Sequence, residues 1–422
     1  MSKKIAIIGA GCAGLHLALY LQKHGVTATI FTDRKSEEYK SCRLLNTVAH
    51  HHVTISREDM LGCNHWPADK YGYFGHYYSV YGQETLDFYG SYTAPSRAVD
   101  YRIYLPQLQD DFIERGGDVR FQRVEPEDVA EIEAEFDLVI VCTGKGPFGR
   151  IFGHQPEHSP FDRPQRMLCV GLFKGIEERP IRAVNMHFSP NVGEMIEIPT
   201  LTYSGMSTAL VIENHIGGDM EILAKTKYEE DPEAFLSLLT DRLKKYYPKC
   251  AERINSSEFD LANNERDLLQ GGVTPTVRDS HKVLESGKLA VALGDVHGVV
   301  DPVLGQGANM ASYAAIILGE EILRHDALDA RFMEAVDARR MDRVLCASRW
   351  TNFMLKNLEE ASPSLMQFVE AISASKACAD DFTENFNFPE RQWDCFASPN
   401  RTSAWIASRM EKHTGVREKV VA

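Results

Sequence analysis

The fold of this chain is decided near its start, by Ile5-Ala6-Ile7-Ile8-Gly9-Ala10-Gly11-Cys12-Ala13-Gly14-Leu15-His16-Leu17-Ala18-Leu19-Tyr20-Leu21. Four apolar residues predict a short buried strand, and three glycines follow at the Gly-x-Gly-x-x-Gly spacing that opens a helix. Gly9 permits a tight turn, Gly11 lets the backbone approach a pyrophosphate, and Gly14 lets the helix lie close to the strand. The first N–H groups of that helix then face a diphosphate. The stretch therefore predicts dinucleotide binding rather than a chance glycine-rich turn.

A second predicted strand, 27–31, leads to an acid at the distance where a ribose hydroxyl is bound. That acid is Asp33, although Thr32 stands where the acid often falls. We expect Asp33 to contact the nucleotide.

Composition narrows the class of protein. With 44% hydrophobic and 25% charged residues and no low-complexity tract, the 422-residue chain has the make-up of a globular enzyme. The net charge of −14 comes without a Lys/Arg run, which argues against nucleic acid and anionic membranes as partners. The run before Gly9 is too short for a signal peptide, and no stretch approaches the roughly 20 apolar residues of a membrane span, so we expect a cytoplasmic protein.

Cysteine and histidine patterns predict no metal site. The nine cysteines are scattered and lack a Cys-x-x-Cys pair, so we expect reduced, mostly buried thiols. In the run 50–52, only His50 and His52 would share the face of a strand, and no third ligand stands at zinc spacing.

A second motif follows the apolar run 289–293, at Gly294-Asp295 and at Pro302 with Gly305-Gln306-Gly307-Ala308-Asn309. A carboxylate at the end of a buried strand can accept a hydrogen bond from a polyol hydroxyl. A glycine-rich helix start can approach a flat, electron-rich group, and its dipole favours negative charge there. A flavin meets both conditions, with the ribityl chain at Asp295. Because this motif is paired with the N-terminal one, we predict FAD rather than NAD.

The order of the expected elements predicts an α/β fold with an insertion. Between about 147 and 263 the sequence changes to long strand-like runs, and it then returns to a buried parallel strand and an Ala-rich helix. We expect a helix to begin near Ser96, with Ser96 as its N-cap. The expected units are a discontinuous FAD-binding domain (1–48, 80–146 and 264–325), an antiparallel-sheet substrate domain (49–79 and 147–263) and a C-terminal helical region (326–422).

Five longer strings carry a family resemblance, at 43–50, 73–78, 94–102, 301–313 and 386–394. They begin Arg43-Leu44-Leu45-Asn46, Tyr73-Phe74-Gly75-His76, Ala94-Pro95-Ser96-Arg97, Asp301-Pro302-Val303-Leu304 and Phe386-Asn387-Phe388-Pro389. On these strings the chain resembles the flavoprotein monooxygenases of the glutathione reductase/para-hydroxybenzoate hydroxylase type of Rossmann fold. Nearly end to end, it is similar to the styrene monooxygenases, the epoxidase components of two-component systems.

The resemblance implies a substrate pocket beside the flavin. It assigns catalytic or pocket-shaping positions to Asn46, Tyr73, His76 and Ser96, and substrate contacts to Arg43, Leu44, Val48, Val211, Pro302 and Val303. Together with the two motifs, it assigns cofactor contacts to Gly9, Gly11, Ala13, Gly14, Asp33, Arg43, Asp295, Pro302, Gly305, Gly307, Ala308 and Asn309. For each of the four polar pocket residues the alternative is a satisfied structural hydrogen bond, and for His76 the two roles are weighted equally.

The resemblance also implies the reaction. Reduced FAD, supplied by a separate NADH-dependent flavin reductase, would react with O2 to form a flavin C4a-hydroperoxide. The hydroperoxide would epoxidise the vinyl group of styrene or a similar aryl alkene, in a protein that forms a homodimer. An alkene carries no proton to be removed, so no general base is needed. Single-component relatives usually carry an Asp-Gly pair where this chain reads Cys142-Thr143-Gly144-Lys145, and no NAD(P)H site is evident.

Three alternatives remain at this point. Indole monooxygenases of the same family differ mainly at pocket positions, and a non-catalytic FAD-fold protein would bind flavin without turnover. A flavin halogenase would need a lysine beside a tunnel, and its Trp-rich signature is absent from the sequence.

Overall fold

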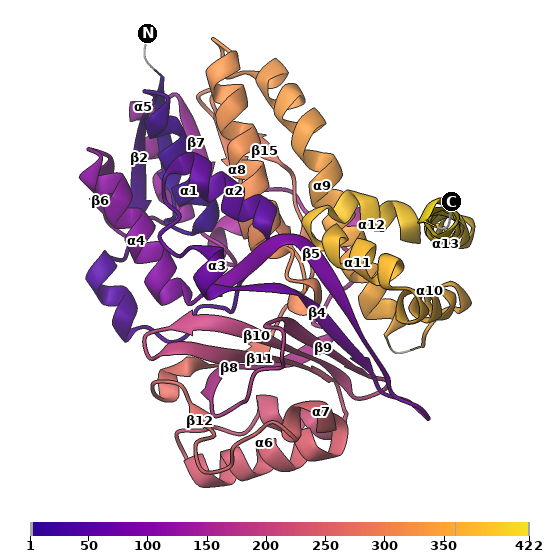
Figure 1. Cartoon of the computed structure of the whole chain (residues 1–422). Helices are drawn as coiled ribbons and strands as arrows, with labels where there is room; N and C mark the ends of the chain where they lie inside the picture. The colour runs from indigo at the N-terminus through magenta and orange to yellow at the C-terminus, as the bar shows by residue number, and fades with distance from the viewer. Residues whose placement is uncertain (1–2, 359, 421–422) are drawn as a thin grey trace.

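The computed structural model describes residues 3–358 and 360–420, with side chains as far as Met410. Figure 1 shows a parallel-sheet unit, a larger sheet beneath it and a group of C-terminal helices at its side. Two short strands, β14 (Thr276–Val277) and β17 (Gly298–Val299), pair with each other outside the two main sheets.

The N-terminal motif folds as the first strand, turn and helix of a six-stranded sheet. The sheet has the order β15-β16-β7-β1-β2-β6, and only the β15–β16 pair is antiparallel. Its strands are β1 (Lys4–Ile8), β2 (Thr27–Thr32), β6 (Asp118–Phe121), β7 (Leu138–Val141), β15 (His281–Val283) and β16 (Leu289–Ala292). Strand β1 is buried on both faces, as its unbroken apolar run predicts, because Ile5 and Ile7 enter one core cluster while Ala6 and Ile8 enter another.

Helices cover both faces of this sheet. Helices α1 (Cys12–Lys23), α4 (Tyr101–Glu114) and α8 (Gly307–Arg324) share a core with one face, and α5 (Val129–Glu135) packs on the other. A short helix, α2 (His52–Leu61), and one turn of helix, α3 (Ala68–Tyr71), connect the first two strands of the second sheet along the chain.

The second sheet has nine strands and is mostly antiparallel. Its path is β12-β8-β11-β10-β9-β4-β5-β3, and β13 also pairs with β8. The strands are β3 (Ala49–His50), β4 (Gly72–Val80), β5 (Leu86–Val99), β8 (Arg166–Lys174), β9 (Val184–Ser189), β10 (Gly193–Thr202), β11 (Gly205–His215), β12 (Asp260–Leu261) and β13 (Leu268–Gly272). Helices α6 (Pro232–Tyr246) and α7 (Pro248–Ala251) cover its outer face.

Strand β5 corrects two expectations. It pairs with β4 and β3, so the antiparallel sheet extends into 86–99, a range that the sequence assigned to the FAD-binding domain. It also includes Ser96, so helix α4 begins later than expected, at Tyr101. The N-cap is Asp100, whose carboxylate accepts a hydrogen bond from the Arg102 N–H. Pairing across the sheet therefore overrides the local capping signal. The remaining domain boundaries stay a prediction.

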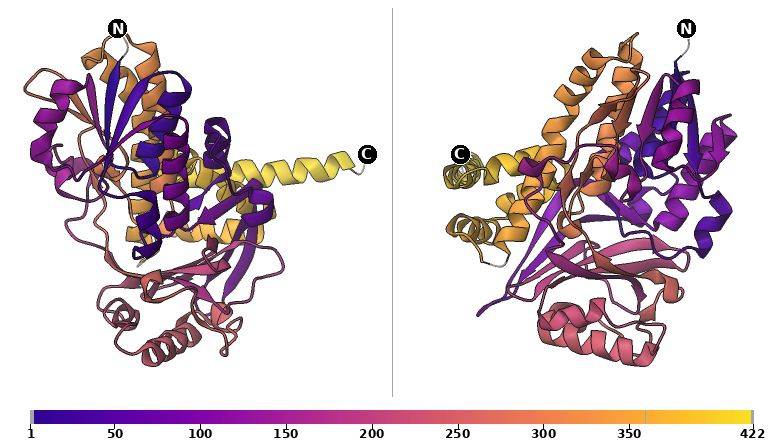
Figure 2. Two further views of the ribbon diagram at one scale, coloured as in Figure 1. Left: turned by 90° about the vertical axis from the view of Figure 1, so that its left-hand side faces the viewer. Right: turned by 180° about the vertical axis from the view of Figure 1, so that it is seen from behind.

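The C-terminal helices form a group that contacts the first unit through α8 and the second sheet through β5. They are α9 (Ala330–Asn357), α10 (Pro363–Ala374), α11 (Lys376–Glu384), α12 (Pro389–Phe396) and α13 (Pro399–Val420), and α13 extends away from the body (Figure 2). Helix α11 lies directly against the backbone of β5 at Gly90. A Cβ on Gly90 would lie 2.3 Å from the Ala379 carbonyl oxygen, so only glycine allows this approach. No helix within the described ranges is both long and apolar enough to span a bilayer.

Candidate active site

A cavity of about 870 Å³ lies between the two sheets. Its nucleotide side is formed where β1, β2, β7 and β16 end, and its other side is formed by the inner face of the nine-stranded sheet. A cavity of this volume at the carboxyl ends of parallel strands is a usual place for a cofactor and a small ligand.

The glycines of the first motif are required by close backbone packing. Gly9 has φ of +109°, and a Cβ there would lie 2.7 Å from the Cys142 carbonyl oxygen. A Cβ on Gly14 would lie 2.2 Å from the Gly9 carbonyl oxygen. Gly11 differs, because the nearest atom to its Cβ would be 3.9 Å away. Gly11 is also the N-cap of α1 and provides no side-chain cap, so the helix start can receive a phosphate.

The second motif lies at the same cavity. Asp295 lines it at the end of β16, and burial raises the pKa of this carboxyl while Lys145 opposes the rise. Gly305, Gly307 and Ala308 line it at the start of α8, which also lacks a side-chain cap. The residues present therefore fit a dinucleotide with a polyol chain and a flat ring, as FAD has.

The inner face of the large sheet supplies an apolar wall. The side chains that line it come from strands β8 to β11, from the segment before α8 and from the segment after α11; they are Leu168, Val170, Val184, Met186, Ile196, Ile198, Val211, Val303 and Phe386. Val211 and Val303 were expected there. The six others on β8, β9 and β10 follow from strand alternation, since residues two apart on each strand share this face, whereas Phe386 lies outside the sheet.

Besides Asp301 Oδ2, three buried polar atoms in the cavity lining have no hydrogen-bond partner among the described residues. They are Tyr73 Oη, His51 Nε2 and Thr143 Oγ1. Buried polar groups are nearly always satisfied, so these atoms are candidates to bind a ligand. Tyr73 was expected at the site from the sequence, whereas His51 and Thr143 were not.

His76 lies in a chain of buried side chains. Its Nε2 is 2.9 Å from Tyr92 Oη, its Nδ1 is 3.2 Å from Tyr78 Oη, and Tyr92 Oη also lies 3.3 Å from His51 Nδ1. Burial lowers the pKa of His76 well below its usual value and that of His51 to about 3, so both imidazoles are neutral at neutral pH. With both ring nitrogens engaged, His76 is held as part of the wall.

Most predicted site residues line the cavity, but five do not. Those that line it are Gly9, Gly11, Ala13, Asp33, Asn46, Val48, Tyr73, His76, Val211, Asp295, Pro302, Val303, Gly305, Gly307 and Ala308. The five outside the lining are Gly14, Arg43, Leu44, Ser96 and Asn309.

The contacts of these residues explain their positions. The Arg43 guanidinium donates to Glu229 Oε1 at 2.6 Å and to the Leu268 carbonyl at 3.2 Å, away from the cavity. Ser96 Oγ accepts the His52 N–H at 3.2 Å. The Asn309 amide accepts from the His51 N–H and donates to the Ala49 carbonyl, so it holds the segment that carries His51. These side chains support the lining rather than form it.

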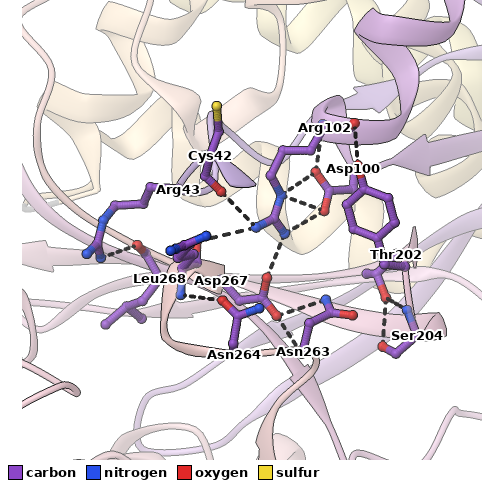
Figure 3. Close-up of polar contacts among 12 residues, drawn as sticks. Cys42, Arg43, Asp100, Arg102, Thr202, Ser204, Asn263, Asn264, Asp267 and Leu268 are labelled. Carbon is purple, nitrogen blue, oxygen red and sulfur yellow. Dashed lines mark hydrogen bonds and ion pairs between the residues drawn. The ribbon is translucent and has the colours of Figure 1, made fainter. Parts of the chain in front are cut away.

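A buried arginine joins the two sheets beside the cavity. Figure 3 shows the Arg102 guanidinium between Asp100 and Asp267, with Nη2 2.6 Å from an oxygen of each carboxylate. Asp267 in turn accepts the Asn263 N–H at 2.6 Å, and Arg102 Nη1 donates to the Cys42 carbonyl at 3.4 Å. The network fixes the start of α4, the loop before β13 and the segment that leads to Asn46.

Known proteins with similar sequences match nearly the whole chain. Residues 144–253 match the family model described as "Styrene monooxygenase A putative substrate binding domain". The chain is 58% identical over 405 residues to "Styrene monooxygenase StyA" of Pseudomonas fluorescens, covering 96% of this chain and 98% of the relative. A relative of the same name from Pseudomonas sp. is 57% identical over 407 residues, with the same coverage. The chain belongs to the styrene monooxygenase family.

Solved structures agree with this family at the level of the fold. PqsL of Pseudomonas aeruginosa, described as a probable FAD-dependent monooxygenase, has a TM-score of 0.63 at 15% identity, covering 86% of this chain and 98% of its own. The flavin-dependent brominase Bmp2 has a TM-score of 0.64 at 11% identity, covering 98% and 99%. The predicted fold class is therefore confirmed: this member of the styrene monooxygenase family has the fold of FAD-dependent monooxygenases.

Proposed function

We propose that the chain is an FAD-dependent monooxygenase that epoxidises the vinyl group of styrene and similar aryl alkenes. The observation that carries the proposal is a single cavity with a dinucleotide-binding turn at one end and an apolar wall at the other. Its place in the styrene monooxygenase family supports the choice of substrate.

Reduced FAD, when bound, supplies the chemistry that activates O2. Gly9–Ala13 would hold the pyrophosphate of that cofactor, and Asp295 would hold its ribityl chain. The uncapped start of α8, at Gly307 and Ala308, lies where its positive end can stabilise negative charge on the flavin ring.

The apolar wall orients the alkene and excludes water. Val211, Val303 and Pro302 contact the cavity beside the motif that holds the flavin, and Asn46 and Tyr73 add polar atoms at its edge. Excluding water protects a reactive oxygen species from side reactions. A neutral His76 with both nitrogens engaged fits a reaction that requires no general base.

We also propose that a separate NADH-dependent flavin reductase supplies the reduced FAD. The support is the segment Cys142-Thr143-Gly144-Lys145 at the end of β7, which lacks the Asp-Gly pair of single-component hydroxylases. With NADH, FAD and this protein alone, we expect almost no product, whereas chemically reduced FAD and O2 should support turnover. Rapid reduction of bound FAD by NADH in a stopped-flow trace would contradict the two-component assignment.

The substrate is tested by comparing two alkenes under single turnover with reduced FAD. We expect styrene to give styrene oxide faster than indole gives indigo. Fast oxidation of indole without epoxide from styrene would assign the chain to indole oxygenation. Flavin binding without oxidation of either would indicate a non-catalytic flavin protein.

A further inference from the structure

A cluster of buried charged side chains lies on the cavity face of the large sheet, beyond its apolar wall. Glu194 on β10 and Glu213 on β11 are paired directly across the two strands. Each lies two residues from a cavity-lining residue, Ile196 and Val211 respectively, so both glutamates face the cavity side. Asp301 lines the cavity itself. All three carboxyl groups are at most 2% exposed.

The three carboxyl groups differ in how many hydrogen bonds they receive. Glu194 receives the Arg166 guanidinium, with Nε 2.8 Å from Oε2. Asp301 Oδ1 accepts the Val303 N–H at 3.2 Å and thereby caps the short turn η8 (Pro302–Leu304). Both oxygens of Glu213, and Oδ2 of Asp301, receive no hydrogen bond from any described N–H or O–H group.

Glu213 and Asp301 are neighbours, because a side-chain hydrogen bond between them is among the causes that shift the pKa of each carboxyl group. Two ionised carboxylates can only accept hydrogen bonds, so a bond between them requires a proton on one of them. Two uncompensated charges in contact and out of water would also be very costly.

The surrounding charges favour that proton. Burial raises the pKa of Glu213 well above its usual value, and the charges of Asp301 and Glu194 raise it further while Arg166 lowers it. Burial likewise raises the pKa of Asp301, which Arg166 and Lys145 oppose.

Two further groups interact electrostatically with the cluster. His215, also on β11, lowers the pKa of Glu194, and the charges of both glutamates add to the burial that raises the pKa of Tyr247.

We propose that Glu213 and Asp301 share one proton, and that Glu213 thereby positions the turn Pro302–Leu304 at the cavity. The turn supplies Pro302 and Val303 to the substrate wall and leads directly into Gly305 and Gly307. Glu213 is thus a positioning residue that acts through Asp301. The part of the inference that concerns the flavin rests on the proposed function.

The shared proton makes the turn depend on pH. The pKa of Glu213 is higher in the folded protein than the ordinary value of 4.5. Its contribution to the free energy of unfolding is therefore fully present below pH 4.5 and is lost as the pH rises through the raised pKa. Above that pH, two charged groups repel each other, and the cap on the Val303 N–H is weakened.

The test compares two substitutions of Glu213 in the full-length chain. Glu213→Gln keeps a neutral N–H donor toward Asp301 at every pH, whereas Glu213→Leu leaves Asp301 without a donor. Glu197→Gln is the matched control, because Glu197 is also buried on β10 but is paired with His187 and Arg253 on the other side of the sheet.

Hydrogen exchange of the peptide that contains Val303 is measured against pH and corrected for the intrinsic rate. In the parent and in Glu197→Gln, protection should fall as the pH rises. In Glu213→Gln it should stay constant, and in Glu213→Leu it should be reduced roughly tenfold at every pH. A parent-like pH dependence in Glu213→Gln, or parent-like protection in Glu213→Leu, would overturn the shared proton. If the Leu variant does not fold, the Gln variant alone decides.

FAD affinity of the same variants tests the positioning role. Glu213→Leu should bind FAD roughly tenfold more weakly than the parent, while Glu213→Gln should retain parental affinity at neutral pH. Parental FAD affinity in a Leu variant whose turn has lost protection would overturn the positioning role. If the parent itself does not bind FAD, the proposed function is contradicted. The shared proton of Glu213 and Asp301 is then tested by the hydrogen-exchange result alone.

Discussion

The two walls of the cavity are built in different ways. The nucleotide wall consists of short, consecutive segments, Gly9–Ala13 and Gly305–Ala308, whose backbone forms the surface. The substrate wall consists of single side chains from many strands, such as Met186 on β9 and Val211 on β11. The first wall tolerates little change at Gly9 and Gly14, whereas the second depends on which face of each strand points inward. Substitutions should therefore have different consequences on the two walls.

The largest effect is expected where the walls are joined. Arg102→Ala would leave Asp100 and Asp267 buried without their guanidinium partner, which costs about 3–5 kcal/mol. The free energy of unfolding, measured with urea, should fall by that amount. A loss below about 1 kcal/mol would show that the two walls are held together by other contacts.

At two glycines of the nucleotide wall, substitutions should affect the free energy of unfolding and the affinity for FAD differently. Gly14→Ala places a Cβ 2.2 Å from a backbone oxygen and should lower the free energy of unfolding by about 1–3 kcal/mol. Gly11→Ala meets nothing closer than 3.9 Å, so it should leave stability nearly unchanged while weakening FAD binding. Thermal unfolding and flavin titration of both variants measure the difference. Equal stability losses would contradict the close approach at Gly14.

The free energy of unfolding should fall in acid because the histidines of the substrate wall are neutral in the folded protein. The pKa of His76 is lowered well below 6.5, so the unfolded chain binds more protons than the folded one below pH 6.5. The free energy of unfolding should therefore fall as the pH drops below 6.5, by about 1.4 kcal/mol per pH unit for one such group. His76→Gln should reduce the slope by that amount. An unchanged slope would mean that His76 is protonated in the folded state.

The two acids of the nucleotide wall should differ in their effect on the flavin. Asp295→Ala should weaken FAD binding by roughly tenfold or more, because a partly buried hydrogen bond to a ribityl hydroxyl is lost. Asp33 is exposed at the end of β2, so Asp33→Ala should have a smaller effect. Equal retention of FAD by the Asp295 variant and the parent would remove Asp295 from the site.

The smallest effect is expected at Arg43, which the sequence placed in the site. Its ion pair with Glu229 is about half exposed, so Arg43→Ala should change the free energy of unfolding by less than about 1 kcal/mol. Epoxidation rate and FAD affinity should remain close to those of the parent. A large loss of epoxidation rate or of FAD affinity would indicate that Arg43 belongs to the active site after all.

The same difference between the walls explains what could be predicted from the sequence. Gly9 and Gly14 are required by backbone packing at the start of α1, where the Gly-x-Gly-x-x-Gly spacing already placed them, although Gly9 packs against Cys142 at the end of the neighbouring strand β7. The side chain of Arg43 was not predictable, because its partners come from residues 229 and 268, far along the chain. The placement of Ser96 failed for a similar reason, since pairing with β4 carries β5 past the expected helix start.

His51 shows a further limit. It stands in a three-histidine run that could be read only as a possible metal motif, and its exposure to the cavity depends on the Asn309 amide holding its backbone. That contact joins residues more than 250 positions apart, and no local sequence pattern predicts it.

Phe386 completes the cavity late in the order of synthesis. Its ring lines the wall, and its carbonyl accepts a hydrogen bond from the Gln306 side chain at 3.1 Å, next to the start of α8. A nascent chain that has emerged only through α8 already has both glycine motifs but still lacks this part of the wall. Capture of the flavin in its final environment must therefore wait until translation has passed Phe386, and a chain interrupted earlier would leave the reactive centre open to water.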